Sequence, residues 1–126
     1  VALGSLVGGV ARYLISVLFT SLLGNGFPWG TLFENVTGSF IIGFYAALTS
    51  PDGRFIASTR QRQFVMIGIC GGYTTFSAFS LETLRLVQSG EVQAAFLNIL
   101  VSIIGWMTAV WIGHALATRL NRLRET

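Results

Sequence analysis

Four long apolar segments limit what this chain can fold into more than any other feature of its sequence. They cover about residues 1–23, 31–49, 64–87 and 92–117. A helix needs about 20 apolar residues to cross the hydrocarbon core of a bilayer, so each segment is long enough to span one. Charged residues make up 10% of the 126 residues, whereas soluble domains carry about 25%. The sequence therefore predicts an all-α membrane protein in which residues 1–126 form one domain of four transmembrane helices.

The third segment contains a stretch that is unusual for a membrane helix, Gly68–Ser80. Gly71 and Gly72 lose much backbone freedom when a helix orders them, and Thr74 and Thr75 carry hydroxyls that compete for backbone hydrogen bonds. A broken helix is stable in hydrocarbon only where protein or a hydrated cavity satisfies the freed backbone groups. Glycine-interrupted apolar segments also indicate binding sites in membrane transporters. We therefore expect the third helix to be broken near its middle, with a binding site at the break.

The charged residues predict an orientation in the membrane. The net charge is +3, and arginine supplies every basic side chain apart from one histidine. Four spans place both termini on one side, together with Arg54, Arg60, Arg62, Arg119, Arg122 and Arg124. The other side carries only Arg85, so the positive-inside rule predicts cytoplasmic termini, and the arginine excess requires no nucleic-acid partner. Arg12 lies within the first segment, where we expect it to pair with a carbonyl or a carboxylate, or to reach the interface.

The polar residues offer no catalytic arrangement. The sequence has no Ser-His-Asp pattern, no carboxylate pair at a useful spacing and no phosphate-binding loop, and His114 and Cys70 are single. We therefore expect neither an enzyme nor a multi-cysteine metal site. What the apolar segments do contain is a set of neutral hydrogen-bond donors, namely Asn35, Asn98, Thr31, Thr37, Ser39, Thr74, Thr75, Ser77, Ser80 and Ser102.

Neutral donors suit a small, partly dehydrated anion, because they supply positive dipoles without a full charge that would trap it. Conduction needs sites that are favourable enough to enter and weak enough to leave. Phe76 and Phe79 are three residues apart, so they lie on one face of a helix and can present their electropositive ring edges to an anion. The same polar residues would also serve as contacts between packed helices. The residues alone therefore predict a small four-helix membrane protein that conducts or transports an anion.

Two stretches, Gly30–Phe40 and Gly71–Glu82, together with Arg12-Tyr13, resemble the Fluc (CrcB) fluoride channels. The likeness covers all four segments. It implies an antiparallel, dual-topology homodimer in the cell (inner or plasma) membrane, surrounded by lipid. In that family, a pair of pores lets fluoride leave the cell passively, which confers fluoride resistance.

The resemblance also implies roles for individual residues. The pore asparagine of the family falls on Asn35, its two aromatic residues fall on Phe76 and Phe79, and its polar track falls on Thr75, Ser77 and Ser102, with Glu82 and Thr31. A structural sodium ion at the centre of the dimer would be held by the backbone carbonyls of Gly71 and Thr74. Two positions depart from the family pattern. Glu34 stands where an apolar residue is usual, and Ala78 stands where a hydroxyl residue is frequent.

Two other functions are compatible with parts of the sequence. A small proton-coupled four-helix exporter would rely on a carboxylate in the first helix, where this chain has only Arg12. An accessory membrane protein would use the polar stripes for packing alone. The arginine distribution, which favours one orientation, also stands against the dual topology that the resemblance implies.

Overall fold

The structure is a computed structural model that describes residues 1–124, all of which belong to helices or to the short connections between them. The helices are α1 (Ala2–Leu23), α2 (Trp29–Leu48), α3 (Thr59–Gln63), a π-helical segment η1 (Phe64–Cys70), α4 (Gly71–Tyr73), α5 (Phe76–Gln88) and α6 (Val92–Arg124). From α3 to α4 the helix is continuous, so the expected third segment consists of this helix followed by α5. The helical fold class that the sequence predicts is confirmed.

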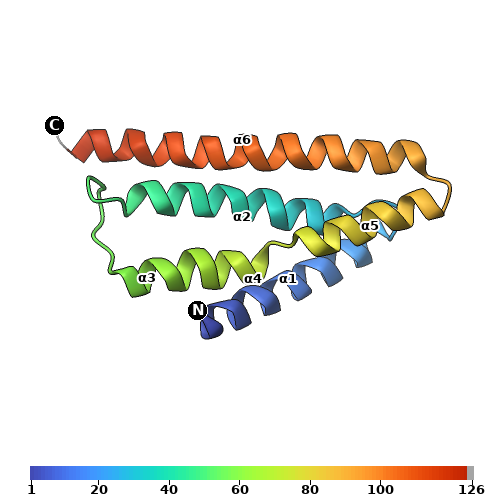
Figure 1. The fold of residues 1–126 in the computed structure, drawn as a ribbon, viewed down its shortest axis with the longest axis horizontal. Coiled ribbons are helices and arrows are strands. Elements are labelled where there is room, and N and C mark those ends of the chain that lie inside the picture. The colour runs from blue at the N-terminus through green and yellow to red at the C-terminus, as the bar shows by residue number, and fades with distance from the viewer. Residues whose placement is uncertain (125–126) are drawn as a thin grey trace.

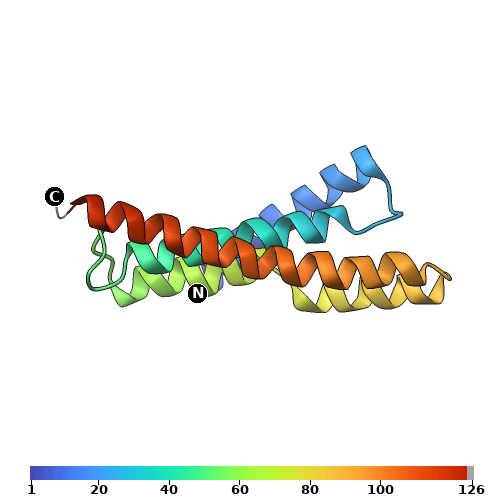
Figure 2. The same ribbon diagram turned by 90° about the horizontal axis from the view of Figure 1, so that it is seen from above.

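The helices form a thin, elongated bundle (Figure 1). The longest helix, α6, packs along α2, and α2 also contacts α1 and η1. On the far side of α2, α1 packs against η1 and α4. Figure 2 shows that the C-terminal part of α1 leans away from the rest of the bundle, while α5 runs beside α6. This arrangement brings α2, α4, α5 and α6 together near the middle of the molecule.

The third segment begins five residues before the expected Phe64, because Ser58 caps α3. The Ser58 hydroxyl accepts a hydrogen bond from the Gln61 backbone N–H (3.1 Å), and the Gln61 side chain accepts one from the Ser58 N–H (2.9 Å). This reciprocal pair is a capping box, which starts a helix. Arg60 and Arg62, which precede the expected third span, therefore lie on α3.

The last helix also continues beyond its expected end at residue 117, to Arg124. Asn121 holds this extension in place. Its side chain donates to the Ala47 carbonyl at the end of α2 (2.9 Å) and accepts from the Arg54 backbone N–H in the following loop (2.6 Å). The basic end of the chain is thus helical as far as the structure describes it.

Three stretches are long and apolar enough to cross a membrane, Ala2–Leu23, Thr59–Gln88 and Val92–Leu123. The fourth expected span, α2, is not one of them, and it carries the buried polar residues Thr31, Glu34 and Asn35. Large apolar side chains are exposed along α1 and α6, as is usual for surfaces that face lipid rather than water. These features are those of a multi-pass membrane protein.

Two extended residues separate α4 from α5. Thr74 has φ −88° and ψ 157°, and Thr75 has φ −154° and ψ 117°. We expected the break to include both the glycine pair and the two threonines, but Gly71 and Gly72 are both helical. Gly72 serves close packing instead, because a Cβ atom there would lie 2.5 Å from the Ser5 carbonyl oxygen of α1. The interruption is therefore at the threonines, not at the glycines.

Candidate functional site

Asn35 of α2 holds the extended pair. Its Nδ2 donates to the Thr75 carbonyl (3.1 Å), and its Oδ1 accepts from the Thr75 N–H (2.7 Å). The side-chain amide therefore gives the Thr75 N–H the partner that the interrupted helix does not supply, and it does so while only 5% exposed. An asparagine amide has two N–H donors, so one remains after the bond to Thr75.

The start of α5 places further donors beside Asn35. The Thr75 hydroxyl accepts from the Ala78 N–H (3.1 Å) as the N-cap of this 13-residue helix, and it lies 3.3 Å from the Ser77 hydroxyl. Ser80 instead donates to the Phe76 carbonyl in its own helix (3.0 Å). The positive end of a helix dipole lies at its N-terminus. The first turn of α5 therefore gathers hydroxyls, backbone N–H groups and positive potential in one place.

The same geometry frees two backbone carbonyls. In a continuous helix, the Thr75 N–H would donate to Gly71 and the Ala78 N–H to Thr74, but here they donate to Asn35 and to the Thr75 hydroxyl. Within residues 1–124, neither carbonyl receives a backbone N–H. Carbonyl oxygens are ligands that hard cations accept, so Gly71 and Thr74 fit a sodium site by donor type. The described His, Cys, Asp and Glu side chains form no group of three that could hold a metal.

Arg12 lies next to this region and is paired as the sequence predicts. Its Nε donates to the Gly72 carbonyl (3.2 Å). The charge in the middle of α1 therefore faces the protein, and it ties α1 to α4.

Three aromatic rings lie beside the extended pair. The centroids of Phe76 and Phe79 are 5.6 Å apart, and Phe79 is buried whereas Phe76 is 70% exposed. Trp106 of α6 contacts both rings in edge-to-face geometry. The sequence predicted the phenylalanine pair, but nothing in the pattern distinguished Trp106 from an ordinary packing or interfacial tryptophan.

A cavity of about 240 Å³ joins these elements. Its lining includes Asn35 and Ser39 of α2, the extended Thr74 and Thr75, Phe76 of α5 and Trp106 of α6, together with Gly38, Ile42, Met66, Cys70 and Gly71. Predicted site residues that are far apart in the sequence thus share one space, which is lined by neutral donors and aromatic rings.

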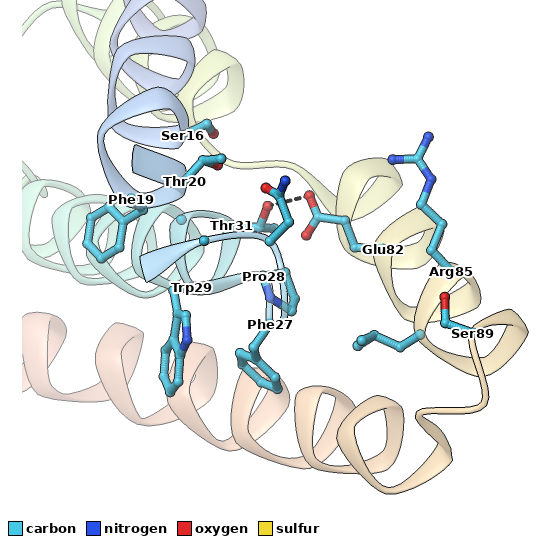
Figure 3. Close-up of a pocket in the computed structure, with 14 residues that line it drawn as sticks. Ser16, Phe19, Thr20, Phe27, Pro28, Trp29, Thr31, Glu82, Arg85 and Ser89 are labelled. Atoms are coloured by element: carbon cyan, nitrogen blue, oxygen red, sulfur yellow. Dashed lines mark hydrogen bonds between the residues drawn. The ribbon is translucent and has the colours of Figure 1, made fainter. Parts of the chain in front are cut away.

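The predicted pair of Thr31 and Glu82 lies elsewhere, at a larger cavity of about 450 Å³ between the ends of α1, α2 and α5. Figure 3 shows the Thr31 hydroxyl donating to the Glu82 carboxylate (2.8 Å), with Arg85 one helical turn further along α5. Ser16, Thr20 and Ser89 also line this space. It is polar and carries both signs of charge, so it differs from the neutral cavity at Asn35.

Ser102, the remaining predicted residue, lines neither of these two cavities. It is 1% exposed and donates to the Asn98 side-chain oxygen (3.1 Å), and the Asn98 amide donates to Thr83 of α5 (3.0 Å). The Thr83 hydroxyl in turn donates to the Phe79 carbonyl (2.8 Å). In a single chain, Ser102 and Asn98 therefore fasten α6 to the helix that carries the phenylalanines.

Glu34 is a residue whose environment the sequence did not predict. It is fully buried, and one oxygen accepts from the Ser16 hydroxyl of α1 (2.6 Å), while the other has no hydrogen-bond partner among the described residues. A buried carboxyl group therefore lies directly before Asn35 in the sequence.

Known proteins resemble this chain along its whole length. Residues 1–114 match the family model described as "CrcB-like protein, Camphor Resistance (CrcB)". A protein of Rhodopseudomonas palustris named fluoride-specific ion channel FluC 1 is 64% identical over the full chain, which covers 89% of that protein. A protein of Bradyrhizobium diazoefficiens named fluoride-specific ion channel FluC 1 is 54% identical over the full chain, which covers 87% of that protein. A protein of Paramagnetospirillum magneticum named fluoride-specific ion channel FluC is 51% identical over 97% of this chain, and the match covers 95% of that protein. Ion channels are transport proteins and not enzymes. The chain belongs to the CrcB family.

Proposed function

We propose that this protein is a passive, fluoride-selective channel of the cell membrane. The names of its relatives support this function. The observation that carries it is the cavity shared by Asn35, Thr75 and Phe76, since it combines neutral donors with an aromatic ring in an otherwise apolar bundle.

The proposed pathway replaces the water around fluoride step by step. The second N–H of Asn35 and the hydroxyls of Thr75 and Ser77 donate to the ion, and the edges of Phe76 and Phe79 contact it with their partial positive charge. None of these donors carries a full charge, so each holds the anion weakly enough to release it. Thr31 and Glu82, at the larger cavity, belong to an outer part of the same path, and Ser102 joins the path from α6 beside the phenylalanine helix.

We further propose that the channel is an antiparallel homodimer with dual topology and a pair of pores. Phe76 is largely exposed in one chain although it lies beside Asn35, which fits a path completed by a second copy. The freed carbonyls of Gly71 and Thr74 in two copies would supply four oxygens to a central sodium ion, which when bound would hold the two interruptions together. In this assembly α2 is the fourth span, with its polar residues turned inward.

The experiment that tests the function is fluoride release from liposomes that contain the purified protein. Fast release that does not depend on a proton gradient, with chloride retained, is the expected result. Release coupled to proton movement would support the exporter, and no release would support an accessory protein.

A further inference from the structure

Trp106 contacts both phenylalanines of the proposed path. The centroid of its ring lies 5.0 Å from that of Phe79, and the two ring planes meet at 75°. For Phe76 the centroid distance is 6.4 Å and the angle between the planes is 69°. The indole N–H is buried and has no oxygen or nitrogen acceptor among residues 1–124. No hydrogen bond among these residues fixes the indole, and its edge-to-face contacts couple its orientation to those of the two phenylalanines.

The orientation of a phenylalanine decides how it meets an anion. The ring edge is electropositive and the ring face is electronegative, so a ring that turns by a right angle changes from attracting fluoride to repelling it. Phe76 is 70% exposed in the single chain, so its own chain packs little of its surface. Trp106 gives it a fixed neighbour, and the same indole lines the cavity that contains Asn35.

We propose that Trp106 is a positioning residue that fixes the orientation of Phe76 and Phe79, and that it thereby sets the preference of the path for fluoride over chloride. The inference rests on the proposed function. It does not depend on Trp106 holding the helices together, because Asn98 and Thr83 already join α6 to α5 by a hydrogen bond.

The test compares Trp106→Leu, Trp106→Phe and the control Trp111→Leu in liposomes. Trp111 lies on the same helix, but it is 69% exposed and outside the aromatic cluster. Two quantities are measured, the fluoride flux and the fluoride-to-chloride permeability ratio from the reversal potential. We expect Trp106→Leu to lower both by about tenfold, as the loss of two aromatic contacts suggests, and Trp106→Phe to retain both within about threefold. Trp111→Leu should match the wild type.

Two results would overturn the proposal. If Trp106→Leu and Trp111→Leu give the same flux and permeability ratio, Trp106 does not position the rings. If Trp106→Phe is as impaired as Trp106→Leu, the indole N–H and not an aromatic ring is what the site needs. Size-exclusion profiles identify variants that fail to assemble. If Trp106→Leu fails to assemble, the flux and permeability ratio of Trp106→Phe decide whether an aromatic ring at this position is sufficient. A wild-type protein that releases no fluoride would refute the proposed function itself, which is a separate outcome.

Discussion

At the scale of single residues, Asn35 has a structural task and a proposed functional one. Its carbonyl oxygen and one N–H hold Thr75, and the second N–H is free to meet an anion. The sequence identified Asn35 through its family likeness and its amide chemistry. It could not show that the amide pairs with a peptide 40 positions away, because that contact exists only when α2 lies beside the extended threonines.

The substitution Asn35→Asp tests the functional task, although it also removes the N–H that donates to the Thr75 carbonyl. The carboxylate retains an acceptor for the Thr75 N–H, but it has no N–H donor and adds a negative charge to the path. We expect fluoride flux to fall by at least about a hundredfold, because like charges repel strongly where water is excluded. The measurement is fluoride release from liposomes, with the exposed amide Gln93→Glu as the control. Normal flux through Asn35→Asp at neutral pH would place Asn35 outside the path.

Glu34 leads to a prediction about stability. One of its oxygens is buried and has no hydrogen-bond partner within residues 1–124, and an unsatisfied buried polar atom costs about 1–3 kcal/mol. Glu34→Met keeps a similar volume and removes that cost, while the Ser16 hydroxyl can turn to a carbonyl of its own helix. We expect the midpoint of thermal aggregation to be unchanged or higher. Ser16→Ala should lower the midpoint, since the carboxyl group then loses its one hydrogen bond. A lower midpoint for Glu34→Met would contradict the prediction and show that the carboxyl group stabilises the fold.

At the scale of helices, the apolar runs and turn residues were sufficient to predict the main elements. The glycines were not sufficient to predict where the third segment is interrupted. Gly71 and Gly72 look alike in the sequence, but the site of a Cβ atom on Gly71 has no neighbour nearer than 4.0 Å, whereas Gly72 abuts Ser5. Whether a glycine breaks a helix or permits two helices to touch depends on the neighbouring element. The extension of α6 was likewise not predictable, because the contacts that Asn121 makes with Ala47 and Arg54 are long-range.

The packing of α1 can be tested with two adjacent glycines. A Cβ atom on Gly8 would overlap the backbone of Ile69 and Tyr73, which cannot rotate away, whereas Gly9 has nothing within 4 Å. We expect Gly8→Leu to destabilise the protein by about 1–3 kcal/mol or to prevent assembly, because overpacking forces the helices apart. Gly9→Leu should change stability by less than about 0.5 kcal/mol. Thermal midpoints of both variants in detergent provide the comparison, and equal effects would mean that α1 does not pack through Gly8.

At the scale of the whole molecule, the distribution of arginine predicts one orientation in the membrane, whereas the proposed assembly needs two. The loop before α3 and the end of α6 lie at one end of the bundle, and the connection between α1 and α2 lies at the other (Figure 1). Six arginines belong to the first end by sequence and one, Arg85, to the second. The positive-inside rule favours cytoplasmic termini for such a chain. An antiparallel homodimer, in contrast, needs equal numbers of chains in the two orientations.

Cysteine labelling of intact cells distinguishes these possibilities. Cys70 is buried, so it should not react with an impermeant maleimide, and Asn25→Cys and Asp52→Cys place exposed thiols at opposite ends. If the proposed dimer is correct, both variants are labelled from outside to similar extents, because each dimer presents one copy of either end. Labelling after cell lysis gives the total for each variant. Labelling of Asn25→Cys alone would mean that the arginines fix a single orientation, and this chain could then not form an antiparallel pair with itself.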